Sequence, residues 1–193
     1  MALARNATIS LCGHFRRFIS TSRIPAAPIK VGDSLPSATV FGKDPSDSFD
    51  IQDLFKDRKG ILFSVPGAFT PGCSKAHLPE YLQNELKFKE EGYDVIACVS
   101  VNDPFVMQAW GEELKADGKV LMIADMKREF TKAIDMELDC RKLLGDIRSK
   151  RYVMLIENNL VKHVSLEPDD TGLACLLCIR TLKQQKRKLE KLR

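Results

Sequence analysis

Apolar positions along the chain fall into two patterns, short continuous runs and longer segments in which they recur every three or four residues. The continuous runs have the length of buried strands and lie at 38–41, 60–65, 93–101 and 120–124. The periodic segments predict a short capped helix at 49–55, helices from about 73 to 91 and from 104 to about 114, and a polar helix at 127–135. Strands and helices therefore alternate through most of the chain.

The last third of the chain has a different pattern. Strand-like runs at 152–156 and 160–166 flank Glu157-Asn158-Asn159, and asparagine tolerates the left-handed backbone of tight turns, so a β-hairpin is expected. The segment from Thr171 onward is expected to be helical. This order predicts an α/β domain with a mixed central β-sheet flanked by helices, which is the outline of a thioredoxin-like fold.

Composition is consistent with one globular domain and short extensions. The 193 residues are 44% hydrophobic and 29% charged, and the formal net charge is +4. Basic residues gather at the two ends, so no nucleic-acid-binding surface is expected across the domain. No run approaches the ~18 apolar residues that a membrane-spanning helix needs, so no membrane association is expected.

The N-terminal segment has the composition of a targeting sequence. It contains arginine, serine and threonine, and no acidic residue precedes Asp33, as is typical of a mitochondrial transit peptide. The alternative is a tail without a targeting role. We expect a transit peptide at 1–27, the folded domain at 28–178 and a basic C-terminal tail at 179–193. The expected location is the mitochondrial matrix, with the cytoplasm as a second site.

The chain has six cysteines, and they are scattered rather than arranged as metal-binding pairs: Cys12, Cys73, Cys98, Cys140, Cys175 and Cys178. This spacing argues against a secreted disulfide scaffold and against a structural zinc site. No metal and no other cofactor is expected. Cys98 lies within an apolar run and is expected in the core, whereas Cys140 receives no assignment.

Cys73 has the strongest signal for chemistry. It follows a predicted buried strand and a loop rich in proline and glycine, and it begins a predicted helix. Helix N-termini stabilise anions, so a thiolate there is favoured, and the thiolate is the nucleophilic form of cysteine. Thr70 could offer a hydroxyl to a substrate. The alternative is that Cys73 is a small buried residue, and His77 is expected to pack beside it rather than to act directly.

The residues around Cys73 match a known signature. Pro66, Thr70 and Cys73 fit the P-x-x-x-T-x-x-C pattern of peroxiredoxins, and the segment 66–74 resembles the mitochondrial peroxiredoxin-5 type. The resemblance covers about 28–178, and its further matching segments are Ser100-Val101-Asn102-Asp103, Trp110-Gly111, Lys150-Arg151-Tyr152 and Glu167-Pro168-Asp169-Asp170-Thr171-Gly172-Leu173.

This resemblance implies a role for each matching residue. Cys73 would be oxidised by a hydroperoxide to a sulfenic acid, and Thr70 would hydrogen-bond the peroxide. Arg151 would hold the thiolate and polarise the substrate, while Pro66 would shield the pocket. Cys175 would resolve the sulfenic acid as an intramolecular disulfide, which thioredoxin would reduce. The implied substrates are hydrogen peroxide, alkyl hydroperoxides and peroxynitrite, and the implied state is a monomer or homodimer.

The chain departs from this pattern beyond Cys175. Cys178 creates a CxxC, so Cys178 could resolve or relay the disulfide, or it could fill an apolar helix face. Two other functions therefore stay open, a thiol–disulfide oxidoreductase using the CxxC and a redox sensor or holdase using Cys73. Arg148 and Lys150, close to Arg151 in sequence, are expected to form a solvated basic cluster.

Overall fold

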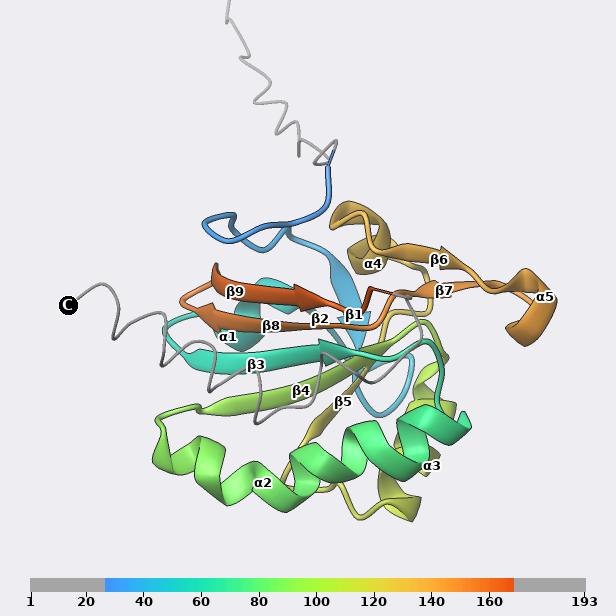
Figure 1. Cartoon of the computed structure of the whole chain (residues 1–193), viewed down its shortest axis with the longest axis horizontal. Helices are drawn as coiled ribbons and strands as arrows, with labels where there is room; N and C mark the ends of the chain where they lie inside the picture. The colour runs from blue at the N-terminus through green and yellow to red at the C-terminus, as the bar shows by residue number, and fades with distance from the viewer. Residues whose placement is uncertain (1–26, 169–193) are drawn as a thin grey trace, which may run out of the picture.

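The computed structural model describes residues 27–168 (Figure 1). A seven-stranded sheet in the order β2-β1-β5-β4-β3-β8-β9 runs through its centre, and β6 and β7 form a separate two-stranded sheet. The strands are β1 (Thr39–Phe41), β2 (Ser48–Asp50), β3 (Lys59–Ser64), β4 (Val95–Ser100), β5 (Leu121–Ala124), β6 (Glu137–Asp139), β7 (Ile147–Ser149), β8 (Tyr152–Glu157) and β9 (Leu160–Leu166).

Helices cover both faces of the large sheet. They are α1 (Ile51–Phe55), the π-helical turn η1 (Cys73–His77), α2 (Leu78–Glu90), α3 (Pro104–Glu113), α4 (Glu129–Ala133) and α5 (Arg141–Leu144). Side chains of α2 and α3 share one apolar core with the sheet, and side chains of α1 and α4 share a second core on the opposite face. Figure 1 shows α2 and α3 together beneath the sheet. The predicted mixed sheet flanked by helices is thus confirmed.

The central strands are those that the continuous apolar runs predicted. β3 pairs in parallel with β4, and β4 pairs in parallel with β5, while β8 joins β3 in the antiparallel sense. Five of the six residues in β3, Gly60 to Ser64, are buried, as are Ile96 to Ser100 in β4. Burial on both faces explains why these strands lack the alternation of a half-exposed strand.

Local signals for helix starts and turns are also confirmed. Asp103 caps α3 by accepting a hydrogen bond from the Val106 backbone N–H at 3.0 Å, and Pro104 occupies the first helical position. The turn between β8 and β9 has Asn158 at φ 47° and Asn159 at φ 61°, the left-handed backbone that asparagine tolerates. Among residues 27–168, no helix has both the length and the apolar character needed to cross a bilayer.

Three features differ from the prediction. Phe49 and Asp50 belong to β2 rather than to the capped helix, which begins at Ile51, because β2 pairs with β1. The helix expected from Cys73 begins as a π-helical turn before it becomes α-helical. The segment 137–149, for which no element was predicted, forms β6, α5 and β7, and Figure 1 shows it projecting from the body of the domain.

Candidate active site

Cys73 lies at the carboxyl end of a central strand, as the sequence predicted. β3 ends at Ser64, a loop follows, and Cys73 is the first residue of η1. Its side chain is fully buried. The backbone N–H of Leu78 donates to the Cys73 carbonyl, which is the five-residue spacing of a π-helix. The thiol is therefore enclosed while its backbone belongs to a single wide turn.

The loop before Cys73 is held by hydrogen bonds within itself and to the end of β4. The Thr70 hydroxyl donates to the Gly67 carbonyl at 2.9 Å, so its proton is engaged and its oxygen can still accept a hydrogen bond. The Ala68 backbone N–H donates to Asn102 Oδ1 at 3.0 Å. Pro66 is buried, and its shielding of the thiol stays a prediction.

Asn102 is a site residue that sequence reasoning missed. Its Oδ1 accepts the Ala68 N–H and lies 2.8 Å from the Ser100 hydroxyl. The sequence offered Asn102 only as part of a helix-start signal and as part of the peroxiredoxin-like segment. Its structural role is to tie the loop before Cys73 to the neighbouring strand.

Arg151 reaches Cys73 from the position directly before the adjacent antiparallel strand, β8. Ser64 at the end of β3 pairs with Tyr152 at the start of β8, so the residues flanking these positions meet at one edge of the sheet. Arg151 Nη2 donates to Cys73 Sγ at 3.4 Å, and the arginine is 3% exposed. A permanently charged donor therefore contacts the sulfur in a place where water screens little of the attraction.

His77 contacts the same guanidinium. Its Nδ1 lies 2.9 Å from Arg151 Nη1, and the imidazole is fully buried. Burial, and secondly the charge of Arg151, lowers the pKa of His77 to about 3. The expectation that His77 packs beside Cys73 is confirmed, and its bond to Arg151 was not foreseen.

Other cysteines differ in their surroundings. Cys98 in β4 is fully buried, and its pKa is raised by burial first and by the proximity of Cys73 second, so it stays a thiol. Cys140, for which no assignment was made, is also buried. Cys175 and Cys178 lie outside the described residues.

Arg148 is not part of a solvated cluster, contrary to the expectation. It is half-buried, and its guanidinium donates to the backbone carbonyls of Val101 and Leu144. These bonds fix the projecting β6–α5–β7 segment against the end of β4. Sequence proximity to Arg151 was misleading because Arg148 belongs to β7 of the two-stranded sheet, whereas Arg151 directly precedes β8 of the large sheet.

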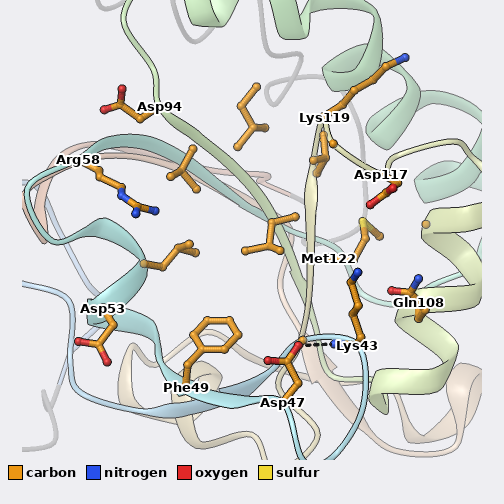
Figure 2. A pocket seen from close by; sticks show the side chains of 18 of the residues that line it. Lys43, Asp47, Phe49, Asp53, Arg58, Asp94, Gln108, Asp117, Lys119 and Met122 are labelled. Atoms are coloured by element: carbon orange, nitrogen blue, oxygen red, sulfur yellow. Dashed lines mark hydrogen bonds between the residues drawn. The ribbon is translucent and has the colours of Figure 1, made fainter.

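A cavity of about 580 Å³ lies elsewhere in the domain (Figure 2). It touches the beginnings of β4 and β5, whereas Cys73 follows the carboxyl end of β3, so the two occupy opposite ends of these parallel strands. Neither a cysteine nor a histidine lines it; Figure 2 labels Lys43, Asp47, Phe49, Asp53, Arg58, Asp94, Gln108, Asp117, Lys119 and Met122. The buried thiol with its cation is therefore the candidate site. Within residues 27–168, no cluster of three or more potential metal-binding side chains was found.

Known proteins resemble the chain over most of its length. Residues 30–176 match the family model Redoxin. The chain is 45% identical over 148 residues to "Peroxiredoxin-2E-2, chloroplastic" of Oryza sativa subsp. japonica, a match covering 73% of this chain and 66% of that protein. The structure resembles peroxiredoxin 5 from Alvinella pompejana with a TM-score of 0.71 and 58% identity, covering 79% of this chain and 99% of that one. It also resembles reduced Prx3 of Vibrio vulnificus in complex with H2O2, with a TM-score of 0.74 and 40% identity, covering 81% and 98%.

Proposed function

Because this chain belongs to the Redoxin family and is a peroxiredoxin, a thiol peroxidase, we propose that its peroxidatic residue is Cys73. The observation that carries the proposal is the contact of 3.4 Å between Arg151 Nη2 and Cys73 Sγ. A guanidinium beside the sulfur favours the thiolate, which is the form that attacks. The proposed substrates are hydrogen peroxide, small alkyl hydroperoxides and peroxynitrite.

In the first step the Cys73 thiolate attacks the terminal peroxide oxygen. A sulfur–oxygen bond forms as the oxygen–oxygen bond breaks, so the sulfur is oxidised to a sulfenic acid and the peroxide is reduced. The leaving oxygen takes up a proton and departs as water or an alcohol. The Arg151 charge stabilises the negative charge on that oxygen, and the Thr70 hydroxyl and the Cys73 backbone N–H hydrogen-bond the peroxide. Pro66 limits the access of water to the sulfur.

The second step is proposed to join Cys73 to Cys175. The Cys175 thiol attacks the sulfenic sulfur, a disulfide forms, and water leaves. The chain before Cys175 passes close to this site, since the Glu167 backbone N–H donates to the Arg151 carbonyl at 3.1 Å. Eight further residues extend at most ~29 Å, so Cys175 can come to the thiol. Cys178 satisfies the same criterion, and the choice of Cys175 rests on the resemblance alone.

Thioredoxin is proposed as the reductant of that disulfide. Because Cys73 is fully buried, the disulfide can form only if η1 unwinds and carries the sulfur out of its pocket. The same unwinding would expose the disulfide to an incoming dithiol. A monomer or a homodimer could complete this cycle within one chain.

The organisation of the chain and its location are part of the proposal. We place the folded unit at 28–178, a mitochondrial transit peptide at 1–27 and a basic tail at 179–193. The matched rice protein is named as chloroplastic, which supports organelle targeting in a relative without specifying the organelle of this chain. Imaging the full chain and a version lacking 1–27, each fused to a fluorescent protein, tests the location.

The decisive experiment measures peroxide consumption coupled to thioredoxin, its reductase and NADPH. Cys73→Ser is expected to abolish turnover, and Cys175→Ser is expected to abolish only the thioredoxin-coupled cycle while single-turnover peroxide reduction persists. Cys178→Ser should behave as the unaltered protein. Full activity of Cys73→Ser contradicts the assignment of the peroxidatic residue. Loss of coupled turnover only in Cys178→Ser would transfer the resolving role to Cys178.

Disulfide mapping gives an independent answer. After one equivalent of peroxide, mass spectrometry of the non-reduced digest should find a peptide pair joined by Cys73 and Cys175. A pair joining Cys73 to Cys98 or to Cys178 would overturn the proposed resolution step. A thiol–disulfide oxidoreductase using the CxxC would instead show a Cys175–Cys178 bond that forms without Cys73.

A further inference from the structure

The guanidinium of Arg151 is shared between two side chains of one helical turn. Nη2 contacts Cys73 Sγ at 3.4 Å, and Nη1 lies 2.9 Å from His77 Nδ1. Cys73 and His77 are the first and last residues of η1. The two nitrogens at the end of the guanidinium thus face two different groups, and the plane of the guanidinium is fixed by both.

The chemistry of arginine defines the state of the histidine. A guanidinium has donors only, so Nδ1 of His77 must accept the hydrogen bond and the ring proton must sit on Nε2. A protonated imidazole could not accept this bond and would repel the neighbouring charge. Burial and the Arg151 charge, which lower the pKa of His77 to about 3, keep the ring neutral. His77 is therefore an acceptor for Arg151 throughout the neutral range.

Neighbouring rings hold the imidazole in place. Its ring centre lies 5.1 Å from that of Phe63 and 5.5 Å from that of Tyr81, both edge to face, and Phe63 and Tyr81 are stacked on each other at 3.8 Å. Among the described residues, His77 Nε2 is buried without a hydrogen-bond partner. A residue needed only to fill this space would not carry a buried unpaired N–H, which is unfavourable.

We propose that His77 is a positioning residue for the peroxidase reaction: its Nδ1 accepts Arg151 Nη1–H and thereby directs Nη2 at the sulfur of Cys73. This inference rests on the proposed function of Cys73 and Arg151. His77 does not touch the peroxide, and it acts through the orientation of the guanidinium. Without it, Arg151 would keep its charge but lose the geometry that places that charge against the sulfur and the leaving oxygen.

Two substitutions separate this role from simple packing. His77→Phe keeps an aromatic ring between Phe63 and Tyr81 but removes the acceptor, and it is expected to slow the reaction of Cys73 with hydrogen peroxide by about 10-fold to 100-fold. His77→Asn places an acceptor oxygen at the same number of bonds from the backbone as Nδ1, so it should recover much of the rate despite its smaller volume. Phe88→Leu alters the same aromatic cluster away from Arg151, and it should lower thermal stability without changing the rate.

The sharpest test is a double-mutant cycle with Arg151→Ala, measured as the rate of Cys73 oxidation in rapid mixing. If His77 acts through Arg151, then His77→Phe should cause no further loss in the Arg151→Ala background. The same loss in both backgrounds would overturn the proposal, as would an unaltered rate for His77→Phe. If His77→Phe does not fold, His77→Leu takes its place in the cycle and the same outcomes apply. An unaltered rate for His77→Phe alongside an inactive Cys73→Ser would refute the positioning role and leave the peroxidase function intact.

Discussion

Replacing Arg151 with glutamine should remove most of the peroxidase rate while leaving the fold in place. At 3.4 Å, with both groups buried, a full positive charge and a thiolate attract by about 5 kcal/mol at an effective dielectric constant of 20. Part of that attraction is offset by the desolvation of the guanidinium, and part is already present before the reaction begins. The remaining loss in transition-state stabilisation is about 3 to 4 kcal/mol, or roughly 10²-fold to 10³-fold in rate.

The assay is a rapid-mixing measurement of Cys73 oxidation by hydrogen peroxide, quenched with an alkylating reagent and read by mass spectrometry. Arg58→Gln is the matched control, because it makes the same change at an exposed arginine beside the distant cavity, and it should retain the full rate. Arg151→Lys should fall between the two, since it keeps a charge but not the planar pair of donors that faces both Cys73 and His77.

Salt provides a second check on the same reasoning. A buried pair is screened little by mobile ions, so the rate with hydrogen peroxide should change by less than about twofold between 0.02 and 0.5 M salt. A loss below about fivefold for Arg151→Gln would refute the electrostatic argument. So would a salt dependence as steep as that of an exposed ion pair.

Three further outcomes are expected. Asn102→Ala should lower the free energy of unfolding by about 1 to 3 kcal/mol, measured by urea denaturation, because it leaves the Ala68 N–H unpaired; an unchanged midpoint would contradict the anchoring role. The contribution of His77 to the stability of the folded state should fall by about 1.4 kcal/mol for each pH unit below 6.5 until about pH 3, since the unfolded chain protonates His77 first. The dependence of stability on pH should therefore be weaker in His77→Phe; equal slopes would contradict this. Trp110, the chain's single tryptophan, donates from Nε1 to the Ser74 hydroxyl in η1 at 3.0 Å, so its fluorescence should shift on peroxide treatment and return with dithiothreitol; no shift would argue against unwinding of η1.

Much of the sheet could be predicted because the local sequence of most of its strands is enough to indicate them. The central strands are continuous apolar runs, and such runs need two covered faces wherever they occur in a chain. The β8–β9 hairpin was similarly visible in its two asparagines. β2 was not visible, because three residues form a strand only through pairing with β1, and their own sequence resembled the start of a capped helix.

The candidate site divides in the same way. Cys73 could be placed after a strand and at a helix start from sequence alone, and its link to Arg151 came from a family resemblance. The bond between His77 and Arg151 could not be predicted, since it joins positions 74 residues apart and depends on the pairing of β3 with β8. The π-helical turn could not be predicted either, because a single turn is too short to produce a repeating pattern of apolar positions.

The pairing register of β3 and β8 allows Arg151 only discrete positions relative to Cys73. Adjacent positions on a strand are separated by about 3.4 Å and face opposite sides of the sheet. A slip of one residue between these strands would therefore turn Arg151 to the wrong face, and a slip of two would move it about 7 Å along the strand, twice the present contact with Cys73. The sheet has no intermediate register to offer. A shift in the pairing register of β3 and β8 would therefore abolish peroxide reduction rather than weaken it gradually. An insertion within either strand should be far more harmful than one in the projecting segment between Glu137 and Ser149.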